Sequence, residues 1–99
     1  MRVEIYLNNI KGGVYKILPL WEEEHDGADV HLDIYLSMLV DEMTGALSTF
    51  PILQEDPQYL EVVSHIHAMR SDNMDQTTCK RKVFHMLSCL EKSEARYHV

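Results

Sequence analysis

The chain has 99 residues, of which 45% are hydrophobic, and a formal net charge of −7. This length predicts a single domain over residues 1–99, and the apolar fraction is typical of a globular chain rather than a disordered one. The acidic balance argues against nonspecific binding to nucleic acid or to membrane surfaces. No apolar run approaches the roughly 20 residues that cross a bilayer, and residues 1–6 do not have the pattern of a secretion signal. We therefore expect no membrane association and a cytoplasmic location.

The first segment has the alternation of a half-buried β-strand. Val3, Ile5 and Leu7 would lie on one face, with polar or charged residues between them. A turn-rich stretch with a Gly-Gly pair follows, and after it a second short apolar stretch. This pattern predicts a β-hairpin over residues 1–18. The hairpin would have to pack on helices or extend into the sheet of a partner, because an isolated hairpin is only marginally stable in water.

Residues 29–49 form the longest periodic apolar segment and predict a central helix. Asp29 is a suitable N-cap residue, because its carboxylate can accept a bond from a free N–H group of the first turn. The core-facing positions recur at helical spacing: Leu32, Leu36, Leu39, Met43, Ala46 and Leu47. Gly45 costs about 1 kcal/mol inside a helix, so we expect either a helix end or a closely packed backbone at that position.

The central helix carries a second apolar strip on its other side. Val30, Ile34 and Met38 follow one another at i, i+4 and i+8, which places them on one line of the helix surface. Either the hairpin or a second copy of the chain would cover this strip, because so small a domain has little else to offer. We predict a homodimer formed at least partly through these three residues, with the symmetry that is commonest in small oligomers.

Two more helices follow. Asp56 and the proline after it form a clear start signal for a helix over residues 57–70. Asp75 can cap a last helix over residues 75–95. Together these patterns predict a mainly α protein, a three-helix bundle-like domain with a small N-terminal β-hairpin.

Charge is segregated along the chain. No lysine or arginine lies between Ile17 and Met69, a stretch that contains eleven acidic residues, whereas the segments before and after it each have a net charge of +2. Acidic and basic segments can attract each other within a chain or between chains. A solvated acidic face that keeps a small protein soluble is the commoner arrangement.

The cysteines and histidines do not form a recognisable site in the sequence. Cys79 and Cys89 lie ten residues apart in one predicted helix, about 15 Å along its axis, which is too far for a disulfide. His65 and His67 would point away from each other on a helix, so they cannot bind one ion together. His85 and Cys89 have the i, i+4 spacing of two zinc ligands, but two ligands do not make a site. We therefore predict neither a metal nor a cofactor.

The sequence predicts an interaction protein rather than an enzyme. No nucleophile with a base can be assembled from spacing, and a small helical domain has little room for a pocket. We expect a self-associating protein–protein interaction or regulatory module. The alternative is helix–turn–helix binding of nucleic acid through residues 57–82. Its proposed contacts are Gln76, Thr77, Lys80 and Arg81, although the acidic net charge opposes it.

Overall fold

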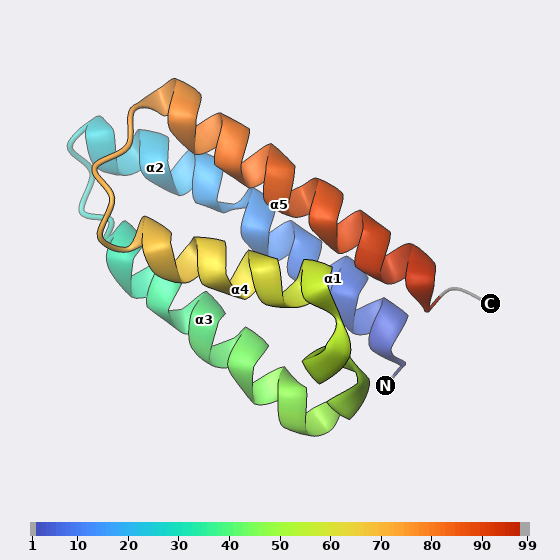
Figure 1. Ribbon diagram of the computed structural model, residues 1–99. Coiled ribbons are helices and arrows are strands. Elements are labelled where there is room, and N and C mark those ends of the chain that lie inside the picture. The colour runs from blue at the N-terminus through green and yellow to red at the C-terminus, as the bar shows by residue number, and fades with distance from the viewer. Residues whose placement is uncertain (1, 98–99) are drawn as a thin grey trace.

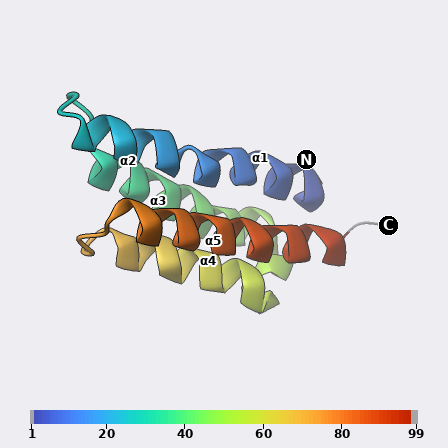
Figure 2. The ribbon, with the colours of Figure 1, turned by 90° about the horizontal axis from the view of Figure 1, so that it is seen from above.

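The computed structural model describes residues 2–97 and is built from helices. Its elements are α1 (Val3–Tyr15), α2 (Ile17–His25), α3 (Leu32–Thr49), the 3-10 helix η1 (Pro51–Glu55), α4 (Pro57–Met69) and α5 (Gln76–Arg96). Helices α1 and α2 lie nearly in line and together form one long helical segment. This segment and the helices α3, α4 and α5 are four arms that pack antiparallel around one core, as in a four-helix bundle (Figure 1 and Figure 2). The predicted mainly α class is confirmed, but a four-arm bundle replaces the predicted three-helix bundle. No helix in the described part of the chain is both long and apolar enough to cross a bilayer.

The predicted β-hairpin over residues 1–18 is wrong. Helices α1 and α2 occupy this segment, and no strand occurs within residues 2–97. The buried positions recur at intervals of three and four residues: Leu7, Ile10, Val14 and Ile17. That is the period of a helix face. The alternation at the start of the chain is too short to distinguish a period of 2 from a period of 3.6, and Ile5 is in fact about half exposed, at 48%.

A bend at Lys16 separates α1 from α2. Pro19 has no N–H group to donate, and its ring crowds the carbonyl group four residues earlier, at Tyr15. Lys16 nevertheless stays in the right-handed helical region (φ −62°, ψ −16°), and its N–H group donates to the Gly12 carbonyl at 3.2 Å. The proline therefore bends the first arm without breaking it into two separate layers.

The two adjacent glycines of α1 allow a matched test of the helix. A Cβ atom at Gly12 would meet no other atom within 4 Å, whereas at Gly13 it would lie 3.3 Å from Leu39 Cδ2 and 3.6 Å from Tyr35 Oη. Gly12→Ala should raise the free energy of unfolding by about 0.5–1 kcal/mol, because alanine loses less backbone entropy on folding. Gly13→Ala should give a smaller gain or a loss. Urea titration of both variants measures the difference, and equal gains would contradict this packing.

Helix α3 begins later than predicted. It starts at Leu32, with His31 at the N-cap position. The Leu32 N–H group is capped not by Asp29 but by Glu24 on α2, which accepts its bond at 2.8 Å. The predicted end at Thr49 is confirmed. Gly45 lies inside the helix and is exposed, with no other atom of the described chain within 4 Å of its Cβ position. The helix therefore does not end at Gly45, and no other backbone of the described chain packs against it, although one of these two arrangements was expected.

Helices α4 and α5 begin at the predicted caps. Asp56 Oδ1 accepts bonds from the N–H groups of Gln58 (3.1 Å) and Tyr59 (3.2 Å). Asp75 Oδ1 accepts a bond from the Thr78 N–H group at 2.7 Å. Both helices end within one residue of the predicted positions. Side-chain capping of the first free N–H groups explains why these starts can be read from sequence.

A tyrosine pair connects three arms through the centre of the bundle. Tyr59 is fully buried, and its hydroxyl group donates to the Met43 carbonyl on α3 at 2.6 Å. The Tyr6 hydroxyl group, on α1, lies 3.0 Å from the Tyr59 hydroxyl oxygen and can donate to it. Burial, together with the nearby Tyr6, raises the pKa of Tyr59 far above its ordinary value. The phenol therefore stays neutral and remains a donor.

A buried carboxylate joins α4 to the end of α5. Asp56 is fully buried, and its Oδ2 atom accepts bonds from the hydroxyl groups of Ser93 (2.5 Å) and Tyr97 (2.7 Å). Burial alone would raise the pKa of Asp56. The hydrogen bonds from Ser93, Tyr97 and the Tyr59 N–H group, together with the nearby Arg96 guanidinium, hold the pKa below its ordinary value of 3.8. The carboxylate is therefore charged at neutral pH although it is buried.

Candidate functional site

The outer face of α3 exposes two large apolar side chains. Ile34 and Met38 are 56% and 60% exposed, and they point away from the buried side of the helix. The buried residues of α3 are Leu32, Leu36, Leu39, Met43 and Ala46. Val30 precedes the helix and is partly buried, so the predicted strip of three residues has two members on α3. The N-terminal segment packs mainly against α5 and leaves both side chains more than half exposed.

A shallow apolar groove lies beside this face, between α1 and α3. It has a volume of about 230 Å³, and its lining includes Tyr6 and Ile10 of α1 and Tyr35 and Met38 of α3. The Tyr35 hydroxyl group donates to the Gly13 carbonyl at 2.5 Å and so ties the two helices together. Met38 therefore belongs both to the exposed face and to the edge of the groove, which extends the apolar surface beyond two isolated side chains.

Two further residues lie on the same outward line of α3. Asp41 and Gly45 follow Met38 at helical intervals of three and four residues, and both are exposed. The aspartate places a charge beside the apolar pair. The glycine has no side chain and leaves the backbone open to close approach by another element. We define Ile34, Met38, Asp41 and Gly45 as the α3 outer face.

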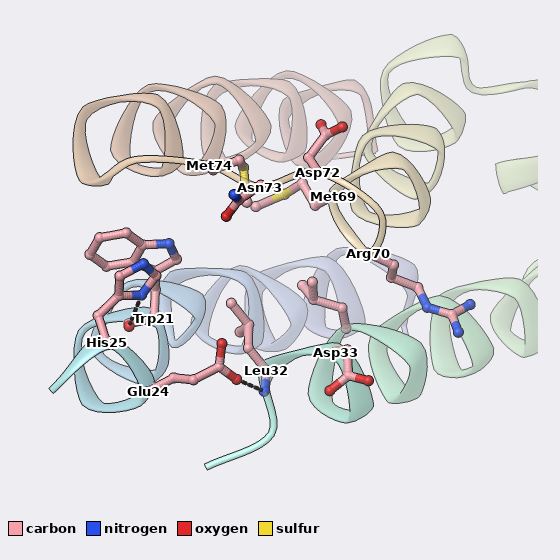
Figure 3. A pocket seen from close by; sticks show the side chains of 11 residues that line it. Trp21, Glu24, His25, Leu32, Asp33, Met69, Arg70, Asp72, Asn73 and Met74 are labelled. Atoms are coloured by element: carbon pink, nitrogen blue, oxygen red, sulfur yellow. Dashed lines mark hydrogen bonds between the residues drawn. The ribbon is translucent and has the colours of Figure 1, made fainter. Parts of the chain in front are cut away.

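A small hollow at one end of the bundle does not provide a ligand site. It has a volume of about 110 Å³ and lies where the α2–α3 loop meets the α4–α5 turn (Figure 3). The rings of Trp21 and His25 stack along one side with their centres 3.6 Å apart, and Arg70 and Asp72 belong to the opposite side. Pockets for organic ligands usually occupy about 300–1,000 Å³, so this space is too small for one.

The residues proposed to contact nucleic acid in the helix–turn–helix alternative lie at the start of α5. Gln76, Thr77, Lys80 and Arg81 are all exposed. Acidic groups lie among them: Gln76 donates to Glu22 at 3.1 Å, and Arg81 lies close enough to Asp75 to help lower the pKa of that carboxyl group. Helices α4 and α5 run antiparallel, side by side (Figure 1). The two helices of a helix–turn–helix motif instead cross at about 90–120°.

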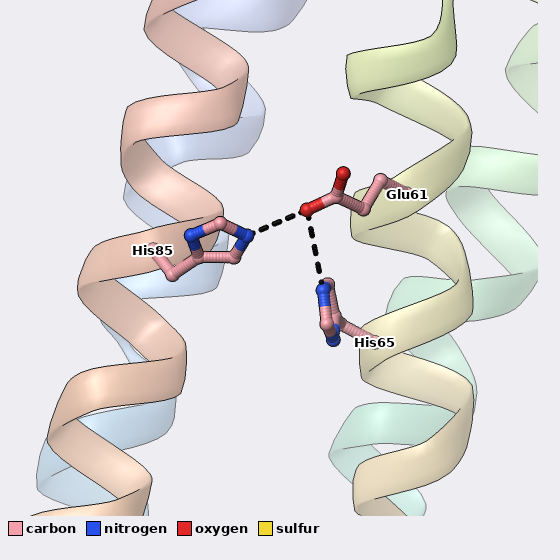
Figure 4. A group of neighbouring side chains, drawn as sticks. All are labelled: Glu61, His65 and His85. Carbon is pink, nitrogen blue, oxygen red and sulfur yellow. Dashed lines mark hydrogen bonds and ion pairs between the residues drawn. The ribbon is translucent and has the colours of Figure 1, made fainter.

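A cluster of potential metal ligands lies between α4 and α5 (Figure 4). Glu61 Oε2 accepts bonds from His65 Nε2 at 3.3 Å, from His85 Nε2 at 2.5 Å and from Cys89 Sγ at 3.5 Å. Cys89 Sγ and His85 Nε2 are 3.7 Å apart. The bonds from His85, Cys89 and His65, in that order of effect, lower the pKa of Glu61. Burial and the bond to Glu61 raise the pKa of the Cys89 thiol.

The sequence spacing indicated only two of the four residues of this cluster as possible metal ligands. The i, i+4 pair His85 and Cys89 has the spacing of two ligands, whereas the spacing of His65 and His67 only excludes a shared ion. The signal for the other half was the matching i, i+4 pair of Glu61 and His65 on α4. His67 is exposed and outside the cluster, as its spacing from His65 predicted.

Comparison with protein-family models, with curated proteins and with solved structures finds no match for this chain. The features of the chain that can support a function are the α3 outer face, the polar start of α5 and the α4–α5 cluster.

Proposed function

We propose that this protein is a self-associating interaction module that pairs the α3 outer face with a second copy of itself. The observation that carries the proposal is the exposure of Ile34 and Met38 opposite the core side of the helix. Two such side chains in water forgo about 1.5–3 kcal/mol each that burial would contribute. The free thiols of Cys79 and Cys89 fit the reducing cytoplasmic compartment that the sequence predicts.

An antiparallel contact between two α3 helices would be isologous, with the same residues on both sides. Gly45 supports this arrangement, because its bare backbone allows close approach of the second helix and nothing within the described chain uses that space. Asp33 and Asp41 would form an acidic rim. Arg70 lines the same surface hollow as Asp33 and supplies a basic neighbour. We expect a modest dependence of self-association on salt for this reason.

The first test substitutes lysine for one residue of the α3 outer face. Ile34→Lys should convert a dimer into a monomer at tens of micromolar, because it places a charge in the apolar contact. Sedimentation equilibrium measures the mass of the wild type and of the variant. Ile52→Lys is the matched control: Ile52 is 53% exposed, against 56% for Ile34, but lies on η1 beyond the far end of α3. The control should remain dimeric.

Three results would contradict the proposal. A monomeric wild type at these concentrations would show that the face does not pair with itself. An Ile34→Lys variant that stays folded and dimeric would place the interface elsewhere. Loss of the dimer in Ile52→Lys alone would assign the contact to η1. A circular dichroism melt of each variant establishes that any change in mass does not come from unfolding.

Nucleic-acid binding is the second candidate, supported by the exposure of Gln76, Thr77, Lys80 and Arg81 on one end of α5. The antiparallel packing of α4 and α5 and the interleaved acids make it the weaker one. Fluorescence anisotropy with duplex DNA, comparing the wild type with a Lys80→Ala, Arg81→Ala double variant, separates the two functions. Binding that is saturable at physiological salt and lost in the double variant would favour this second function.

A further inference from the structure

We propose that helices α4 and α5 hold between them a site for one divalent transition-metal ion of the zinc class. The four proposed ligands are Glu61, His65, His85 and Cys89. The site lies on different helices from the α3 outer face and does not depend on self-association. Figure 4 shows the glutamate and both histidines converging on one point between the two helices.

The spacing of the four residues is that of two ligand pairs. On each helix the two positions are four residues apart, so they lie on the same face one turn from each other. Zinc enzymes use this i, i+4 spacing when two histidines of one helix bind the same ion. Here α4 supplies one pair and α5 the other, and the antiparallel packing of the helices brings His85 to the height of Glu61 and His65.

Three of the distances between the ligand atoms are close to those around a tetrahedral ion. Zinc bonds of 2.0–2.3 Å place neighbouring tetrahedral ligand atoms about 3.3–3.6 Å apart. Glu61 Oε2 lies 3.3 Å from His65 Nε2 and 3.5 Å from Cys89 Sγ. Cys89 Sγ lies 3.7 Å from His85 Nε2. The ligand atoms of the glutamate and the two histidines all lie within 4.8 Å of one another. Cys89 is not part of this group of three and approaches it through Glu61 and His85, so its side chain must shift to complete the shell.

One contact must lengthen when the ion enters. His85 Nε2 lies 2.5 Å from Glu61 Oε2, which is a hydrogen-bond distance and shorter than a tetrahedral edge. Both side chains are about half exposed, at 53% and 46%, so a rotation of either can widen the gap. This exposure also gives the ion a path from solvent. The ion replaces the hydrogen bonds that converge on Glu61. Both histidines bind it through an unprotonated Nε2, with the ring proton exchanged through solvent onto Nδ1, and the Cys89 thiol releases its proton to solvent.

The donor atoms select the class of metal. A thiolate sulfur and two imidazole nitrogens are softer ligands than magnesium and calcium prefer, and they suit zinc and its neighbours in the transition series. One carboxylate and one thiolate balance the two positive charges of the ion. Four protein ligands also close the coordination shell, as in structural rather than catalytic zinc sites. The ion would therefore fasten α4 to α5.

Metal binding is measured on the untagged, chelator-treated and reduced full chain. Titration with zinc sulfate in a calorimeter should give one ion per chain with an affinity tighter than about 1 µM. Cobalt chloride should give the visible absorption of four-coordinate cobalt, with a thiolate charge-transfer band in the near ultraviolet. Saturating zinc should raise the melting temperature by about 5–10 °C, because the ion binds only the folded chain.

The variants test each helix separately. Glu61→Gln on α4 and His85→Ala on α5 should each weaken zinc binding about a hundredfold or more, and Cys89→Ser should remove the charge-transfer band. His67→Ala is the matched control, because His67 is an exposed histidine of α4 outside the cluster. It should bind zinc as the wild type does. Melts in the presence of chelator establish that every variant is folded.

Several outcomes would overturn the proposal. The wild type could bind no zinc in a saturable manner, or its cobalt spectrum could lack the thiolate band. His85→Ala could bind as tightly as the wild type, or His67→Ala could lose binding. A stoichiometry of one ion per two chains in sedimentation with zinc would also refute a site formed within one chain. None of these outcomes bears on self-association of the metal-free protein through α3.

Discussion

Leu39→Asp should abolish cooperative folding. Leu39 lies at the middle of the buried side of α3, is 4% exposed and contacts the position of Gly13 on α1. An unpaired carboxylate at this site costs several kcal/mol, against a total stability of about 5–15 kcal/mol for a domain. Circular dichroism should show loss of the thermal transition, and the variant should accumulate as insoluble protein.

Thr44→Asp is the control for this prediction. Thr44 lies on the same helix and is exposed, so the same carboxylate there remains hydrated. Its melting temperature should stay within a few degrees of the wild type, since surface substitutions usually change stability by less than about 0.5 kcal/mol. A cooperative melt of Leu39→Asp close to that of Thr44→Asp would show that this side of α3 is not the core.

Asp56→Ala should lower the free energy of unfolding by about 2–4 kcal/mol, from the lost helix cap and the hydroxyl groups of Ser93 and Tyr97 left without an acceptor. The melting temperature should fall by about 10–20 °C. Asp75→Ala removes a cap of the same kind from α5, but an exposed one, and should cost clearly less. Equal losses in the two variants would show that the buried hydroxyl bonds contribute nothing.

The charge of Asp56 should make this contribution depend on pH. Because the folded pKa lies below the ordinary value of 3.8, the stabilisation is complete above that value and is lost as the pH falls through the folded pKa. Asp56→Asn keeps an oxygen for the cap but lacks the charge. Urea titrations of wild type and Asp56→Asn should therefore converge at acid pH. A constant difference from neutral to acid pH would show that the charge plays no part.

Local signals predicted the parts of the fold that depend on neighbours in sequence. The starts of α4 and α5 follow from aspartate caps whose bonds reach only two or three residues ahead. The start of α3 could not be predicted in this way. Its cap comes from Glu24 on α2, a contact across a loop that only the packing of the two helices creates.

The N-terminal segment is helical, although two local signals in its sequence favour a strand. Six alternating residues and a Gly-Gly pair are both typical of hairpins. In the folded chain, the apolar contacts of α1 with α5 outweigh the poor helix propensity of Gly12 and Gly13. In so short a segment, tertiary packing decides between the strand period of 2 and the helix period of 3.6. The residues of α5 against which α1 packs lie some 60 residues further along the sequence.

The α4–α5 cluster could not be predicted from the sequence for a different reason. Each helix has a ligand pair that can be read from spacing, but a site requires the two pairs to meet. The register of α4 against α5 decides this, and it is set by the turn after Met69 and by the core residues that both helices bury. A shift of one helical turn would separate Glu61 from His85 by about 5.4 Å along the axis.

Because the first helix packs against the last one, α1 can reach its final packing only late in synthesis of the chain. Helix α1 is complete at Tyr15, but its main partner begins at Gln76, after 60 intervening residues. At about 5–20 residues per second, the ribosome takes roughly 3–12 s to add this stretch. Throughout that interval the apolar face of α1 lacks its cover. The glycine pair then has a benefit, because a nascent segment of low helix propensity presents no preformed apolar stripe to other chains.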